Sequence, residues 1–134
     1  MQAISAYLWL LVAAGASLVN GLAALGATVP AIDTDADYHV LGAGFVTLLI
    51  LGVGARLLPG LGQRTLRSQA LVWATFALGN AAALLRVGPF FLPTDAAASL
   101  DGALLSLAGL AALAALTVFG LNIAGPDSPR RRPA

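Results

Sequence analysis

The sequence predicts an all-α integral membrane protein built as a bundle of four transmembrane helices. The first observation is composition: 59% of the 134 residues are hydrophobic and only 10% are charged, whereas soluble domains carry about 25% charged residues. The second is size, because so small a domain buries only about two-thirds of the surface that its unfolded chain exposes. The third is segmentation, since charges and turn formers divide the chain into four apolar stretches. We therefore expect the lipid bilayer to be part of the solvent of this protein.

Each apolar stretch is about 20 residues or longer, the length that crosses a ~30 Å hydrocarbon core as a helix. Only helices and closed barrels satisfy backbone polar groups in lipid, and the stretches lack the period-two alternation of strands. The predicted transmembrane domain covers residues 1–125, and the charged, proline-rich tail over 126–134 is expected to be disordered and cytoplasmic. The predicted spans cover about residues 4–29, 39–58, 68–87 and 99–124.

Prolines mark the end of each span in turn. The first span ends before Pro30, the second at Pro59, the third before Pro89 and the fourth before Pro126, as expected for a residue that lacks the backbone N–H a helix needs. The first span has no basic start and is too long for the apolar region of a typical signal peptide. We therefore expect it to be retained as a transmembrane helix.

The arginines predict the orientation. In a four-span topology six of the seven basic residues lie on one side, and Arg86 alone lies on the other with most of the carboxylates. Basic residues gather on the cytoplasmic side of membrane proteins, so both termini are expected in the cytoplasm. The six arginines of that side are Arg56, Arg64, Arg67, Arg130, Arg131 and Arg132.

Several function classes find no support in the sequence. The chain has no cysteine, which excludes disulfides, thiolate metal sites and a thiol nucleophile. No serine–histidine–carboxylate order, phosphate loop or metalloprotease motif is visible, so no catalytic residue is assigned and an enzymatic activity stays open. No basic, aromatic-rich module supports nucleic-acid binding.

Small residues recur at four-residue spacing and predict close helix contacts, as they do between helices in lipid. The second span carries four glycines that do not follow this spacing, and they favour close contact with a neighbouring helix or with a flat ligand. The contacts are expected within the bundle, in a homo-oligomer or with a larger membrane protein. The residues concerned are Ala13, Ser17 and Gly21 in the first span, Gly42, Gly44, Gly52 and Gly54 in the second, and Ala108, Ala112, Gly120 and Ala124 in the fourth.

Three ionisable residues are predicted to share one depth near the outer interface: His39, Arg86 and Asp101. His39, the only histidine, is either an interfacial residue hydrogen-bonded to a carboxylate or carbonyl, or a ligand of haem or a metal, as imidazole commonly is. Arg86 either pairs with Asp101 or holds an anionic group such as a haem propionate, which a guanidinium matches with two parallel hydrogen bonds.

A lone histidine limits the metal chemistry. Zinc takes about four protein or water ligands and copper at least two or three nitrogen or sulfur donors, which His39 alone cannot supply. A five-coordinate haem needs one axial histidine, whereas a bis-histidine haem needs a second subunit here.

The pattern of the second and third spans resembles the NnrS family, multi-span bacterial membrane proteins related to haem–copper oxidase subunit I and linked to nitric oxide stress. Members have about twelve spans and several histidines, so this chain resembles one four-helix unit. The resemblance implies the bacterial inner membrane, and it implies haem as cofactor with His39, Gly42 and Arg86 at the site. The matching residues are His39, Gly42, Gly44, Phe45, Thr47, Gly52, Arg56, Pro59, Asn80 and Arg86.

Three functions stay open from the sequence. The first is a haem-associated protein of nitric oxide or respiratory metabolism, acting through His39. The second is a non-catalytic accessory subunit of a larger membrane protein. The third is a small transporter or channel lined by Asn20, Thr47 and Asn80.

Overall fold

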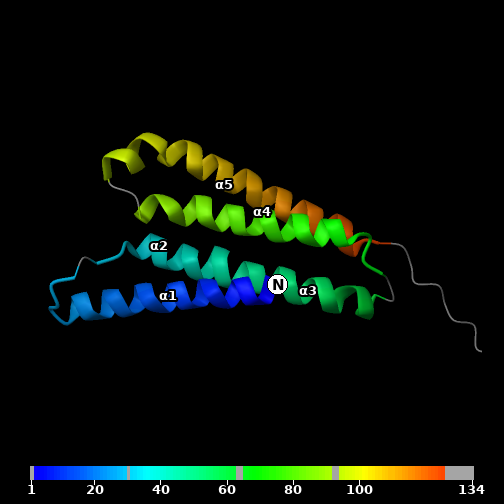
Figure 1. Cartoon of the computed structure of the whole chain (residues 1–134), viewed down its shortest axis with the longest axis horizontal. Helices are drawn as coiled ribbons and strands as arrows, with labels where there is room; N and C mark the ends of the chain where they lie inside the picture. Colours follow the sequence, from blue (N-terminus) through cyan, green and yellow to red (C-terminus); the bar gives the residue numbers. More distant parts are fainter. Residues whose placement is uncertain (1, 30, 63–64, 92–93, 126–134) are drawn as a thin grey trace, which may run out of the picture.

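The computed structural model describes residues 2–29, 31–62, 65–91 and 94–125, with the backbone alone for 91 and 94–101. The described residues form four long helical stretches that run antiparallel (Figure 1). All four contain a segment long and apolar enough to cross a membrane, which confirms the predicted fold class. The elements are α1 (Gln2–Ala24), α2 (Thr34–His39), the π-helix η1 (Val40–Val46), α3 (Thr47–Leu61), α4 (Gln69–Val87), the 3₁₀ helix η2 (Gly88–Phe91) and α5 (Thr94–Ile123).

The helix ends differ from the sequence expectation around the first loop. Helix α1 ends at Ala24, five residues before the predicted end of its span, because Gly26 takes a left-handed φ of 87° that glycine adopts without steric cost. Helix α2 begins at Thr34, where the sequence suggests an acidic loop. The Asp33 side chain accepts a hydrogen bond from the Asp35 N–H at 2.7 Å, and such a cap stabilises the start of a helix.

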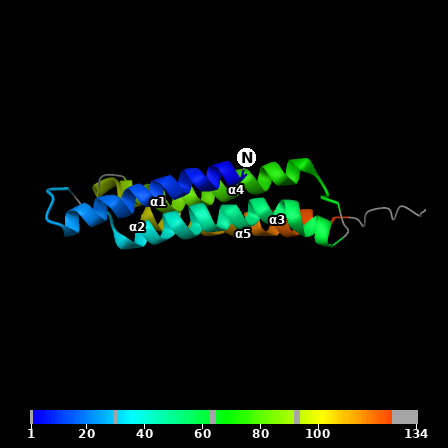
Figure 2. The same ribbon diagram turned by 90° about the horizontal axis from the view of Figure 1, so that it is seen from below.

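The helices pack as two hairpins laid against each other. Helix α1 lies along η1 and α3, and α4 lies along α5 (Figures 1 and 2). Helix α4 also contacts η1 and α3 and so joins the two hairpins. Helix α1 begins at the N label in Figure 1, short of the end of the bundle, and the last part of α3 and the first part of α4 extend beyond it. The tail predicted over 126–134 lies outside the described residues.

The contacts between helices depend on small residues. A Cβ added at Gly79 would lie 2.7 Å from Leu48 Cδ2, and one at Gly44 would lie 2.7 Å from the Trp9 ring. Of the small residues predicted to form four-residue faces on the first and fourth spans, Ala13 and Ala108 are buried. The buried face of α5 instead repeats every seven residues, at Ala108, Ala115 and Asn122.

Large apolar side chains cover the outside of the bundle. Leu11 is 69% exposed, Leu110 63% and Leu113 64%. Soluble domains this small rarely expose contiguous apolar surface on this scale. The outer surface therefore suits a lipid environment, and the protein is a membrane protein.

Candidate functional site

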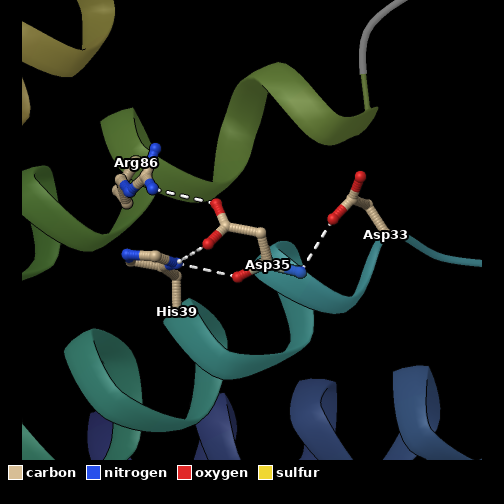
Figure 3. Close-up of polar contacts among 4 residues, drawn as sticks. All are labelled: Asp33, Asp35, His39 and Arg86. Carbon is tan, nitrogen blue, oxygen red and sulfur yellow. Dashed lines mark hydrogen bonds and ion pairs between the residues drawn. The ribbon is translucent and has the colours of Figure 1, made fainter.

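The candidate site lies at the end of the bundle where α2 begins, and we call its three ionisable residues Asp35, His39 and Arg86 the His39 cluster. Asp35 and His39 stand four residues apart in the single turn of α2, and Arg86 comes from the last turn of α4. Figure 3 shows the Asp35 side chain between the other two, with the capping residue Asp33 beside it. The cap on α2 therefore holds the segment that carries both Asp35 and His39.

Hydrogen bonding fixes the proton on the His39 ring. Nδ1 lies 2.7 Å from the backbone carbonyl oxygen of Asp35 and 3.3 Å from Asp35 Oδ1. A carbonyl oxygen only accepts hydrogen bonds, so Nδ1 must carry the proton and donate it. In the neutral ring this leaves the lone pair on Nε2, which makes no hydrogen bond to another described residue. The side chain is 34% exposed, so the imidazole is partly accessible from outside the bundle.

Arg86 joins the cluster through the other carboxylate oxygen. Its Nη2 donates to Asp35 Oδ2 at 2.9 Å, and its side chain is 25% exposed. A guanidinium has five N–H donors, so the bond to Asp35 leaves donors for another anionic group. One of the two expectations for Arg86 was a pair with Asp101, whose side chain lies outside the described residues.

The backbone after His39 departs from α-helical geometry. Residues Val40–Val46 form a π-helix, and the Thr47 hydroxyl donates to the Gly42 carbonyl at 2.8 Å. Short π-segments inside α-helices often occur at functional sites. Gly42 is exposed, and a Cβ there would meet nothing within 4 Å. Gly44, by contrast, is covered by Trp9, so Gly42 alone offers an open surface about one turn from His39.

The polar residues considered for a transport path are hydrogen-bonded in separate places. Asn20 Oδ1 accepts from the Ile32 N–H at 2.7 Å, which ties α1 to the first loop. Asn80 Oδ1 accepts from Trp9 Nε1 at 3.2 Å and from the Ser5 hydroxyl, which ties α4 to α1. Thr47 bonds to its own helical stretch. The three side chains therefore do not converge on one polar path in the described structure.

The residues at the site fit a haem better than a free metal ion. No group of three or more histidine, cysteine or acidic residues converges within the described part of the chain, and a free zinc or copper ion needs such a group. A haem needs a single axial ligand from the protein. His39 leaves Nε2 without a hydrogen bond to another described residue, Gly42 follows about one turn later with open space, and Arg86 adds a cation.

Sequence reasoning singled out His39 and Arg86 but not Asp35, which links them. Asp35 was one of several carboxylates assigned only to the same side of the membrane. The signal that marks it is its spacing: it follows the capping residue Asp33 and precedes His39 by one helical turn. Residues four apart on a helix are neighbours in space, so this pattern predicts the Asp35–His39 contact once the segment is recognised as a helix.

Fold and site together define a four-helix integral membrane protein that carries one accessible imidazole, supported by a carboxylate, at one end of its bundle. The family model described as NnrS protein matches residues 4–125, nearly the whole chain. The chain therefore belongs to the NnrS family. Searches of the curated proteins and of the solved structures found no significant match.

Proposed function

We propose that this NnrS-family protein is haem-associated, with His39 as the axial ligand through Nε2, and that it serves nitric oxide or respiratory metabolism in the bacterial inner membrane. The observation that carries the proposal is the 2.7 Å contact between His39 Nδ1 and the Asp35 carbonyl. Histidines that bind metals commonly donate their second ring N–H to a carbonyl or carboxylate, which fixes the tautomer and orients the ring. Asp35 offers His39 both kinds of acceptor.

Two further features support a haem at this position. Arg86 keeps guanidinium donors beyond its bond to Asp35, and such donors suit the carboxylates of haem propionates. Gly42 presents backbone without a side chain one turn from His39, which leaves room for a flat group. A haem held by His39 would supply an iron that can bind a diatomic ligand such as nitric oxide.

His39 lies at the edge of the four-helix unit, so the proposal includes a neighbouring unit that completes the surroundings of the haem. The chain has no second histidine, and a bis-histidine haem would use His39 from two copies. Helix α5 offers a face for such an assembly: Ala112 and Ala124 are exposed, and a Cβ at Gly120 would meet nothing within 4 Å. Small residues on a free face allow another helix to approach closely in lipid.

The test is an absorption spectrum of the purified protein in detergent, with and without added haem. We expect a Soret band in the wild type, its loss in His39→Ala, and its partial return when imidazole is added to that variant. Tyr38→Ala is the matched control, because Tyr38 is the preceding residue, is 71% exposed and lies outside the His39 cluster. Far-UV circular dichroism checks that each variant stays helical.

The proposal fails if haem-supplemented wild type shows no Soret band, or if His39→Ala keeps the band unchanged. The accessory-subunit interpretation would then lead, with Asp35 and His39 as a structural pair at the start of α2. Copurification of a larger membrane protein with the wild type from native membranes would support that interpretation.

A further inference from the structure

A second feature of the bundle lies far from the His39 cluster, where α1 begins. Gln2 packs against Gly52 in the middle of α3, since a Cβ at Gly52 would lie 2.8 Å from Gln2 Cβ. Helix α3 continues from there to Leu61, and α4 begins at Gln69 beside it. A groove between α3 and α4 opens at this point, next to the first residues of α1.

This groove forms a cavity of about 530 Å³, within the range of roughly 300–1,000 Å³ that is typical of small-molecule sites. The first residues of α1, the second half of α3 and the first half of α4 line it. Trp73, Phe76 and Leu57 give it an apolar wall. Its polar side chains are Arg56, Gln69 and Gln2, and the Gln2 amide donates to the Val72 carbonyl at 3.4 Å. The cavity is thus amphipathic, with a cation at one position and hydrocarbon around it.

The positive charge of Arg56 has no carboxylate partner in the described part of the chain. Arg56 is exposed and makes no ion pair or hydrogen bond with another described residue. The carboxylates whose side chains are described, Asp33, Asp35 and Asp37, lie at the opposite end of the bundle around α2 (Figure 1). Arg56 lines an apolar groove between two transmembrane helices. Such a groove is complementary to an amphiphile whose head is anionic and whose tail is apolar.

We propose that this cavity binds an anionic glycerophospholipid, with its phosphate at Arg56 and an acyl chain along Trp73 and Phe76. Arg56 stands five residues before the end of α3, about 7 Å from the helix end at ~1.5 Å per residue. That depth brings the guanidinium near the headgroup region and the aromatic wall among the acyl chains. Basic pockets between transmembrane helices are known to hold acidic lipid headgroups.

The experiment uses the native fluorescence of Trp73, which is 48% exposed in the wall of the cavity. The full-length protein is reconstituted in vesicles containing brominated phosphatidylglycerol or brominated phosphatidylcholine, because bromine quenches tryptophan only at contact. We expect phosphatidylglycerol to associate about fivefold more strongly, the ratio that ~1 kcal/mol per arginine near the surface gives. Trp73→Phe measures the contribution of Trp9, the other tryptophan, which packs in the core.

Two variants distinguish lipid binding in the cavity from general attraction of anionic lipid to the positively charged surface. Arg56→Gln should bring the association ratio to about one, whereas Arg67→Gln should keep it, because Arg67 is exposed near the same end and is not part of the cavity wall. Should Arg56→Gln fail to fold by circular dichroism, Arg56→Met carries the same test. Equal quenching by the two lipids in the wild type overturns the proposal. So does a loss in Arg67→Gln as large as that in Arg56→Gln, which would indicate a diffuse surface potential.

Discussion

The Asn80 amide joins α4 to two side chains of α1, and its removal gives the sharpest test of the packing. Asn80 on α4 accepts hydrogen bonds from two α1 side chains, the Ser5 hydroxyl and Trp9 Nε1, and its own Nδ2 donates to the Phe76 carbonyl at 2.9 Å. In Asn80→Leu the side chain keeps a similar volume but loses the acceptor. Ser5 and Trp9 are then left with donors in a poorly hydrated contact.

The expected cost follows from the number of interhelical bonds. Side-chain hydrogen bonds between transmembrane helices contribute about 0.6 kcal/mol on average and about 1.7 at most. Losing the two bonds to Ser5 and Trp9 should therefore lower the free energy of unfolding by about 1–3 kcal/mol. Combining Asn80→Leu with Trp9→Phe, which removes the indole donor, should give a coupling energy of about 0.6 kcal/mol in a double-mutant cycle.

The assay is unfolding in mixed micelles with increasing sodium dodecyl sulfate, followed by far-UV circular dichroism. Thr117→Val is the control: the Thr117 hydroxyl is exposed and bonds the Leu113 carbonyl of its own helix, so its loss should change stability by less than about 0.5 kcal/mol. The reasoning is refuted if Asn80→Leu unfolds together with Thr117→Val, or if Asn80 and Trp9 show no coupling.

Two further predictions follow from the orientation and from the π-helix. Reporter fusions at Gly62 and after residue 134 should read cytoplasmic and a fusion at Asp35 periplasmic, because six of the seven arginines lie on one side; a periplasmic reading at Gly62 contradicts the topology. Gly44→Ala should destabilise the protein by about 1–3 kcal/mol in the same unfolding assay, since its Cβ would meet the Trp9 ring at 2.7 Å. The matched variant Gly42→Ala has open space and should be neutral or stabilising by up to ~1 kcal/mol; equal effects would contradict the packing.

The four helices could be predicted from the sequence because crossing a bilayer demands only length and apolar composition, which every span shows. The contact faces could not. In lipid the outward and inward sides of a helix are both apolar, so Ala112 and Ala115 look alike in the sequence although only Ala115 is buried. Of the four-residue pattern on the fourth span, the bundle therefore buries Ala108 and leaves Ala112 and Ala124 exposed.

The site was predictable in part, for a related reason. His39 and Arg86 stood out because ionisable side chains are costly within a span. Asp35 did not, since the acidic segment before the second span looked like a loop until the cap at Asp33 made it helical. The π-helix over Val40–Val46 packs against α1, for example at Gly44 and Trp9. Such contacts join residues far apart in the sequence and leave no local pattern.

The π-helix also separates two geometric requirements along one continuous stretch. Helix α3 keeps Leu48 and Leu51 buried in the bundle. At the other end of η1, the His39 ring contacts Asp35. Each residue of an α-helix turns the chain by about 100°, given 3.6 residues per turn, and a π-segment holds more residues per turn. Deleting one residue within Val40–Val46 would thus rotate the imidazole around the helix axis by about a quarter of a turn or more while α3 kept its packing face. The direction in which His39 points therefore depends on the residue count of η1 as well as on the packing of the helices.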